Sequence, residues 1–175
     1  MELLIREVTI IDAEKNIFGD VYIKDGKIQE IGSNLNRQCE EIRGEGKILL
    51  PAFIDLHCHF RDPGLTYKED LLSGSLAALR GGYSAVNLMA NTKPICSTMD
   101  TIGYVLDKAR EIGLIEIHQT ASITRNFDGK DISHLKDLDS SVRFISDDGK
   151  GIVSNKVMLE AMLFAKENDL TIISH

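Results

Sequence analysis

Short apolar segments alternate with amphipathic segments over most of the chain, and this alternation predicts its secondary structure. From residue 51 onward, short apolar runs predict strands at 53–57, 84–89, 114–117, 142–146 and 170–174. Apolar residues at helical spacing predict helical segments at 68–79, 99–112, 133–138 and 154–167. Strands that alternate with helices form parallel sheets, because each helix carries the chain back to the start of the next strand. The sequence therefore predicts an α/β fold from residue 51 onward.

The first fifty residues show short apolar runs without a helical period. Segments 21–24 and 27–31 flank Asp25-Gly26. Asp-Gly between two such runs is typical of a β-hairpin, because glycine accepts the positive φ of the tight turn. We therefore predict a small β-rich domain over residues 1–50, followed by a second domain over residues 51–175.

The length of the second domain suggests part of a barrel. A complete (β/α)₈ barrel has about 250 residues, or about 31 per strand–helix unit, so residues 51–175 hold about four units. We predict the first half of such a barrel, about strands one to five. Half a barrel leaves sheet edges unpaired, and we therefore expect a truncated form of a longer protein. A complete small five-stranded α/β domain remains the alternative.

Composition and charge exclude some classes of protein. The chain has 175 residues, of which 43% are hydrophobic, so it can bury a core. Its formal net charge of −7 argues against a nucleic-acid-binding surface, which needs clustered Lys and Arg. No apolar run reaches the ~18–20 residues of a membrane span. The three scattered cysteines fit a reducing, cytoplasmic location better than a disulfide scaffold.

Two histidines at the end of the first predicted strand after residue 51 are candidate metal ligands. His57 and His59 are two residues apart, so in a strand their side chains share one face while Cys58 points to the other. Paired imidazoles suit Zn²⁺ and similar metals. Barrel active sites lie at the carboxyl ends of strands, which favours the metal interpretation over two polar loop residues.

Other candidates follow later strands. Asp147 and Asp148 come directly after the fourth predicted strand, where Asp-Asp-Gly is also an ordinary turn sequence. His175 ends the fifth predicted strand and would reach the same rim of the sheet. His118 is close to the end of the third strand, whereas His134, in a polar helical stretch, is predicted to be a surface residue.

Arg61 and Asn91 are candidate substrate-binding residues. An arginine beside a metal site would repel the cation unless it faces an anion, and a guanidinium can hold a carboxylate through two hydrogen bonds. Asn91 follows the second predicted strand and could add amide hydrogen bonds. The alternatives are an ion pair of Arg61 with Asp62 or Glu69, and a turn role for Asn91.

Several segments together resemble a known family. In chain order they are Asp25-Gly26-Lys27-Ile28, Pro51-Ala52-Phe53-Ile54-Asp55-Leu56-His57-Cys58-His59, Phe60-Arg61-Asp62-Pro63-Gly64, Met89-Ala90-Asn91-Thr92 and Ser146-Asp147-Asp148-Gly149. The strand that ends in His-x-His resembles the amidohydrolase superfamily, and the later segments are similar to the dihydroorotases within it. The resemblance runs through the whole chain. It implies the first half of an amidohydrolase (β/α)₈ barrel that follows a small β-domain.

The resemblance also implies roles for individual residues. His57, His59 and His175 match metal-ligand positions for one or two Zn²⁺ ions. Asp148 matches the bridging carboxylate of a bacterial subgroup, although a shift by one residue to Asp147 remains open. Arg61 and Asn91 match residues that bind the substrate carboxylate. One departure is Ala90, where the family often has proline.

The implied reaction is the reversible, zinc-dependent hydrolysis of the cyclic amide of dihydroorotate to N-carbamoyl-L-aspartate in pyrimidine biosynthesis. The family's remaining histidine ligand and catalytic aspartate would lie after residue 175, so the 175-residue chain alone is expected to be inactive or nearly so. One alternative is another cyclic amidase, a hydantoinase or an allantoinase. A second is a non-catalytic subunit that supports aspartate transcarbamoylase. Either that partner or a homo-oligomer is compatible with the sequence.

Overall fold

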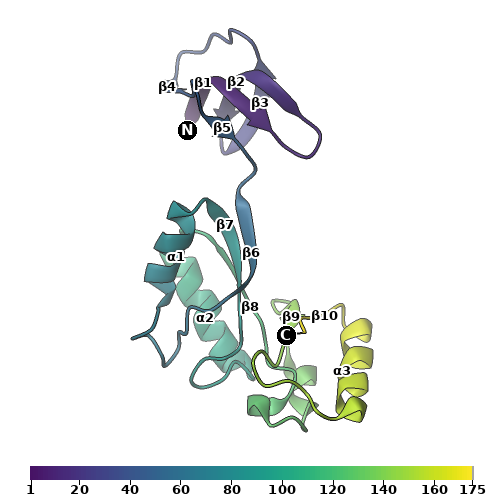
Figure 1. The fold of residues 1–175 in the computed structure, drawn as a ribbon. Coiled ribbons are helices and arrows are strands. Elements are labelled where there is room, and N and C mark those ends of the chain that lie inside the picture. The colour runs from purple at the N-terminus through teal and green to yellow at the C-terminus, as the bar shows by residue number, and fades with distance from the viewer. Residues whose placement is uncertain (175) are drawn as a thin grey trace. The chain divides into compact units, whose positions relative to one another are not determined.

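The computed structural model describes residues 1–174, which form two compact units (Figure 1). The first unit is Met1–Ala52, and the second begins at Phe53. Among the described residues, no helix has both the length and the apolar character that crossing a bilayer requires. The candidate site residues of the sequence analysis all belong to the second unit or lie outside the described residues.

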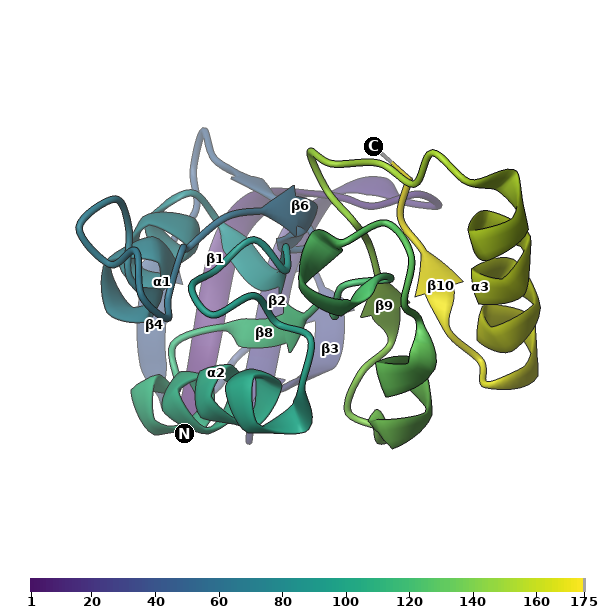
Figure 2. The ribbon, with the colours of Figure 1, turned by 90° about the horizontal axis from the view of Figure 1, so that it is seen from below.

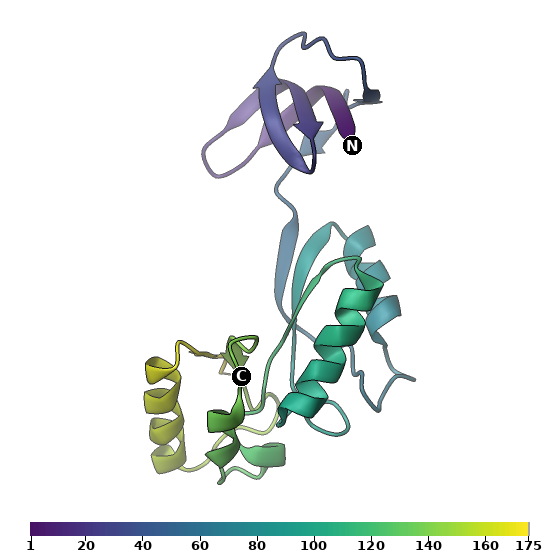
Figure 3. The ribbon, with the colours of Figure 1, turned by 180° about the vertical axis from the view of Figure 1, so that it is seen from behind.

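The first unit is a five-stranded sheet. Its strands are β1 (Glu2–Ile11), β2 (Asn16–Lys24), β3 (Lys27–Gly32), β4 (Glu40–Arg43) and β5 (Ile48–Leu49). Antiparallel pairing joins β3 to β2 and β2 to β1, while β4 and β5 pair with β1 in parallel. Figure 3 shows the strands of this unit in purple to blue. The predicted hairpin is confirmed: Asp25 and Gly26, at φ of 52° and 73°, form the turn between β2 and β3. Two positive φ angles in succession are the reason for the Asp-Gly sequence.

A buried carboxylate fixes the irregular part of this sheet. The pairing of β1 with β2 shifts register between Ile5 and Val8. Asp20 is 4% exposed and accepts hydrogen bonds from the backbone N–H groups of Glu7 and Leu35, both at 2.9 Å. The first bond satisfies a backbone group that the bulge removes from the ladder, and the second holds the loop after β3.

The second unit alternates strands with helices. Its strands are β6 (Phe53–Cys58), β7 (Tyr83–Leu88), β8 (Glu116–Gln119), β9 (Phe144–Ile145) and β10 (Thr171–Ile172). Its helices are α1 (Leu71–Arg80), α2 (Met99–Ile112), the 3₁₀ segments η1 (Arg125–Phe127) and η2 (Ser133–Asp137), and α3 (Asn155–Glu167). Parallel pairing gives the order β6-β7-β8 in one sheet and β9-β10 in another. A parallel bridge between Ala121 and Ile145 connects the two, so the strands follow one another in chain order (Figure 2). The mixed α/β class predicted from the sequence is confirmed.

Some element boundaries differ from the prediction. Helix α1 begins at Leu71 rather than at residue 68, because the Asp70 side chain caps it by accepting a hydrogen bond from Ser73 N at 2.8 Å. The segment predicted as strand 142–146 is a strand only at Phe144–Ile145. The short helical piece after residue 132 is a 3₁₀ helix.

Helices α1 and α2 cover one face of the three-stranded sheet and bury its apolar side chains (Figure 1). The central members of this core are Leu71, Val86, Leu88, Ile102, Val105 and Ile117. Val86 and Leu88 of β7, two residues apart, both contribute to it, as expected for side chains on the face of a strand that packs against helices. The core therefore holds the strand ends that carry the candidate site.

Gly74 lets helix α1 pack directly on Phe60, the residue between His59 and Arg61. A Cβ at Gly74 would lie 2.6 Å from the Phe60 ring. We expect Gly74→Ala to lower the free energy of unfolding by about 1–3 kcal/mol, the usual effect of overpacking a core. The measurement is denaturant unfolding, with Gly103→Ala as the matched control.

Gly103 lies within helix α2, and a Cβ there would meet no atom of residues 1–174 within 4 Å. Since alanine is the better helix former by about 1 kcal/mol, Gly103→Ala should be neutral or stabilising. Equal effects of the two substitutions would contradict the proposed contact with Phe60.

Candidate functional site

His57 and His59 lie together at the carboxyl end of β6. Their ring centroids are 5.2 Å apart and the ring planes meet at 72°. The backbone N–H of His57 donates to Asp55 Oδ1 at 3.0 Å, which fixes the chain just before the first ring. Cys58 instead packs against the hydrophobic core, and burial raises the pKa of its thiol to about 12. The two imidazole rings therefore face the same space, while the sulfur of Cys58, which lies between them in the sequence, is directed into the core.

The carboxylate of Asp148 lies between these two rings. Asp148 follows β9 and is 5% exposed. Its Oδ1 is 3.3 Å from His57 Nε2, and its Oδ2 is 3.6 Å from His59 Nε2. Among residues 1–174, these three side chains form the one group of three or more whose ligand atoms lie within 4.8 Å of one another.

The donor set fits a divalent metal ion. Zinc binds histidine nitrogen and carboxylate oxygen at about 2.1 Å, so two ligands of a tetrahedral ion lie about 3.4 Å apart. The observed separations of 3.3 Å and 3.6 Å bracket that value. Nitrogen and oxygen donors without thiolate are typical of zinc and related borderline metals.

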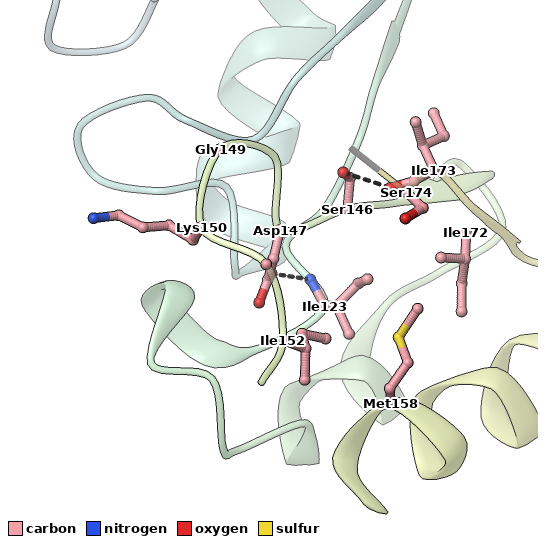
Figure 4. Close-up of a pocket in the computed structure, with 11 residues that line it drawn as sticks. Ile123, Ser146, Asp147, Gly149, Lys150, Ile152, Met158, Ile172, Ile173 and Ser174 are labelled. Atoms are coloured by element: carbon pink, nitrogen blue, oxygen red, sulfur yellow. Dashed lines mark hydrogen bonds between the residues drawn. The ribbon is translucent and has the colours of Figure 1, made fainter. Parts of the chain in front are cut away.

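Asp147 and Asp148 have different surroundings. Asp147 turns toward the residues before η1, where its Oδ1 accepts from Ile123 N at 2.8 Å (Figure 4). The same oxygen accepts from Thr124 N at 3.0 Å. The Thr124 hydroxyl also donates to Asp147 Oδ2. Asp147 lines a pocket of about 500 Å³ beside β10 and α3. Of the two neighbours, only Asp148 belongs to the cluster with the histidines.

Asn91 contacts two of the three candidate ligands, His59 and Asp148. Its Nδ2 donates to Asp148 Oδ2 at 3.1 Å, and its Oδ1 is 2.9 Å from His59 Nδ1. Because a carboxylate only accepts, the amide nitrogen faces Asp148 and the amide oxygen faces the imidazole. His59 Nδ1 then donates to Asn91, which leaves the Nε2 lone pair available to a cation. Such outer hydrogen bonds commonly orient metal-binding histidines.

Arg61 lies beside Asn91, and its guanidinium forms no ion pair within residues 1–174. Its Nη1 donates to the backbone carbonyl oxygen of Asn91 at 3.5 Å. No carboxylate of residues 1–174 forms an ion pair with Arg61, because Asp62 pairs with Lys108 and Glu69 bonds to Ser73. The alternative of an ion pair to Asp62 or Glu69 is therefore wrong. A guanidinium in this position can bind an external carboxylate.

The loops that carry Arg61 and Asn91 pair backbone to backbone. Lys93 N donates to the Pro63 carbonyl oxygen at 3.0 Å. Gly64, at φ of 84°, approaches so closely that a Cβ there would lie 1.8 Å from Lys93 O. The side chains of the two loops are thereby held close together.

The remaining histidines have other surroundings. His175 lies outside the described residues. His118 is paired with Glu116 at 3.0 Å and does not belong to the cluster of His57, His59 and Asp148. The surface position predicted for His134 is wrong: it is 2% exposed, and its Nε2 is 2.9 Å from the Ser122 carbonyl oxygen. Burial lowers the pKa of His134, which favours its neutral form.

Asp62, Tyr104 and Lys108 form a further cluster next to Arg61, which the sequence did not predict. Asp62 accepts from Lys108 Nζ at 2.7 Å and from the Tyr104 hydroxyl at 3.1 Å. The hydrogen bond to Asp62 raises the pKa of Lys108. The available signal was the spacing of Tyr104 and Lys108, which places both on one face of α2. Spacing alone does not identify a carboxylate from a distant loop as their common partner.

A family model and the curated relatives agree on one family. A family model described as dihydro-orotase-like matches residues 46–175. A dihydroorotase of Clostridium botulinum (strain Eklund 17B / Type B) is 57% identical over 178 residues, which cover 100% of this chain and 45% of that protein. A dihydroorotase of Sulfurihydrogenibium sp. (strain YO3AOP1) is 39% identical over 168 residues, covering 93% of this chain and 40% of that protein. The chain thus spans less than half the length of these curated relatives.

Solved structures share the fold at lower identity. A dihydropyrimidinase from Brevibacillus agri NCHU1002 has a TM-score of 0.75 and 21% identity, covering 100% of this chain and 40% of that one. A D-hydantoinase (dihydropyrimidinase) from Thermus sp. has a TM-score of 0.67 and 26% identity, covering 99% and 40%. A dihydroorotase crystal structure has a TM-score of 0.64 and 14% identity, covering 99% and 50%.

Proposed function

This chain belongs to the dihydro-orotase-like family, and from that premise we propose that its protein catalyses the reversible hydrolysis of dihydroorotate to N-carbamoyl-L-aspartate. One observation carries the proposal: an arginine with no carboxylate partner among residues 1–174 lies beside a cluster of metal-ligand type. Dihydroorotate presents the two groups that this pair of sites needs, an anionic carboxylate and a cyclic amide. Pyrimidine biosynthesis is the corresponding pathway.

The proposal extends to the architecture and the metal. The chain order of the parallel strands supports a first half of a (β/α)₈ barrel over residues 51–175, after a small β-rich domain over residues 1–50. His57, His59 and Asp148 would hold Zn²⁺, as one or two ions. When bound, zinc supplies Lewis-acid activation of a carbonyl group and of water.

The chain's own residues bind and orient the substrate. The Arg61 guanidinium holds the substrate carboxylate through charge-assisted hydrogen bonds. Asn91, placed 2.9 Å from His59 and 3.1 Å from Asp148, keeps both side chains aimed at the same space. The paired loops fix the substrate carboxylate relative to the cluster of His57, His59 and Asp148, so that the ring amide of the substrate lies over this cluster. Positioning of this kind can contribute several kcal/mol to catalysis, within the roughly 7–11 kcal/mol attributed to orientation.

Replacing Arg61 tests the substrate assignment. In the complete gene product, we expect Arg61→Met to raise KM for dihydroorotate about 10- to 100-fold, since a hydrogen bond to a charged group contributes about 1.5–3 kcal/mol. The value of kcat should change less, because the carboxylate lies away from the reacting amide. Steady-state kinetics measure both constants.

Arg110→Met is the matched control, because Arg110 is an exposed arginine whose ion pair is with Asp107 on the same helix. An unchanged KM in Arg61→Met would refute the carboxylate role. A wild-type protein that hydrolyses hydantoin in preference to dihydroorotate would refute the substrate assignment.

The structural likeness to hydantoinases makes the hydrolysis of a hydantoin ring the second candidate function. A hydantoin ring carries no carboxylate, so that reaction has no use for Arg61. The Arg61 guanidinium pairs with no carboxylate of residues 1–174, which favours dihydroorotate over hydantoin or allantoin. A non-catalytic subunit beside aspartate transcarbamoylase is disfavoured for a related reason, because such a subunit has no need of the His57, His59 and Asp148 cluster.

A further inference from the structure

Asp62, the residue after Arg61, is a fully buried acid with a complete set of partners. Its side chain is 0% exposed. A buried carboxylate is unfavourable unless it is paired and hydrogen-bonded. Lys108 Nζ donates to Oδ2 at 2.7 Å, the Tyr104 hydroxyl donates to Oδ1 at 3.1 Å, and Leu71 N donates to Oδ2 at 3.3 Å.

These partners come from both helices that cover the sheet. Leu71 is the first residue of α1, while Tyr104 and Lys108 lie one turn apart on α2. The Lys108 ammonium also donates to the Tyr104 hydroxyl at 3.3 Å, so the two side chains support each other. Asp62 thereby ties the loop after β6 to the two helices at once.

The loop needs such an anchor, because Arg61 has an unfavourable backbone conformation. Its φ of 60° lies in the left-handed region, which a non-glycine residue adopts at a cost in free energy. The conformation also places the Arg61 carbonyl to accept from Leu65 N at 3.0 Å. A strained residue persists where its surroundings hold it in place.

We propose that Asp62, held by Tyr104 and Lys108, is a positioning residue that fixes the Arg61 guanidinium for the substrate carboxylate. The inference rests on the proposed function for its ligand, and on the contacts above for its mechanism. Asp62 does not contact the substrate. Its effect passes through the backbone of its neighbour, so loosening this cluster should weaken substrate binding while metal binding is unchanged.

The first test is kinetic and uses the complete gene product. We expect Asp62→Asn and Lys108→Met to raise KM for dihydroorotate about tenfold, less than the roughly hundredfold that a 1 Å misplacement can cause. The value of kcat and the metal content should stay near those of the wild type. Lys108→Arg, which keeps the charge, should restore KM most of the way. Should Asp62→Asn fail to fold, Tyr104→Phe replaces it, since Tyr104 is 45% exposed.

Asp107→Asn is the matched control. Asp107 precedes Lys108 on α2 and forms an exposed ion pair with Arg110 at 2.6 Å. Its replacement should leave KM unchanged. The proposal is overturned if Asp62→Asn and Asp107→Asn have the same KM, or if kcat and metal content fall in parallel with the rise in KM, because that pattern indicates general loss of structure.

The second test is independent of the reaction. The amides of Leu65 and Lys93 report on the loop, because they donate to Arg61 O and Pro63 O. We expect hydrogen exchange over segments 59–66 and 91–96 to be about tenfold faster in Asp62→Asn than in Asp107→Asn, with equal protection in β7. If the wild type does not turn over dihydroorotate, the proposed function fails and this measurement alone decides. Unchanged exchange then overturns the positioning role.

Discussion

Replacing His57 with alanine is expected to abolish stoichiometric metal binding by this protein. The substitution removes one of three clustered donors and leaves Asp148 without the imidazole that lies 3.3 Å from its Oδ1. Loss of a group that only orients a ligand weakens metal affinity about 10- to 100-fold, so we expect the loss of a ligand itself to reach about a thousandfold. Elemental analysis after dialysis and competition with a chelator measure the stoichiometry and Kd.

His118→Ala is the control for this substitution. His118 is also a partly exposed histidine at a strand end, but it pairs with Glu116 and is not part of the cluster. It should retain the metal content and Kd of the wild type. If the two variants bind metal equally well, the assignment of His57 as a ligand is wrong.

The second large effect is expected from Gly64→Ala. A Cβ at this position would lie 1.8 Å from Lys93 O, a backbone atom that cannot move without its loop. The φ of 84° adds a conformational penalty of about 1–2 kcal/mol. Together with an overpacking cost of about 1–3 kcal/mol, the free energy of unfolding should fall by about 3 kcal/mol. The loops would separate, so KM for dihydroorotate should also rise, by roughly a hundredfold.

Gly129→Ala separates the two contributions. Gly129 also has a positive φ, of 72°, but a Cβ there would meet no described atom within 4 Å. It should show the conformational penalty alone, without an effect on KM. Denaturant unfolding and steady-state kinetics of both variants provide the comparison. Equal losses of stability would mean that the loops do not depend on their close approach.

The sequence predicted the parts of this fold that depend on local periodicity. Apolar runs located all five strands from residue 51 onward, because strand and helix patterns differ in period. Boundaries were less predictable where a single side chain sets them. Asp70 ends the turn before α1 by capping Ser73 N, and nothing in the apolar pattern marks that position. Strands β9 and β10 are shorter than their apolar runs because pairing, rather than composition, limits them.

The candidate site was predictable in its residue types and less so in its contacts. The spacing of His57 and His59 reflects the two-residue period of a strand, which sequence displays directly. The choice between Asp147 and Asp148 depends on which carboxylate meets the amides of residues 123 and 124, a tertiary contact. His134 shows the same limit, because its polar neighbours suggested exposure while the Ser122 carbonyl accommodates it in the interior.

Asn91 joins two binding events through one residue. Its side-chain amide contacts His59 and Asp148, and its backbone carbonyl oxygen accepts a hydrogen bond from Arg61. When two ligands share an orienting group, each alters the affinity for the other by the same factor, whichever arrives first. Cation and anion should consequently bind cooperatively in this protein, with Asn91 as the residue through which that reciprocity is transmitted.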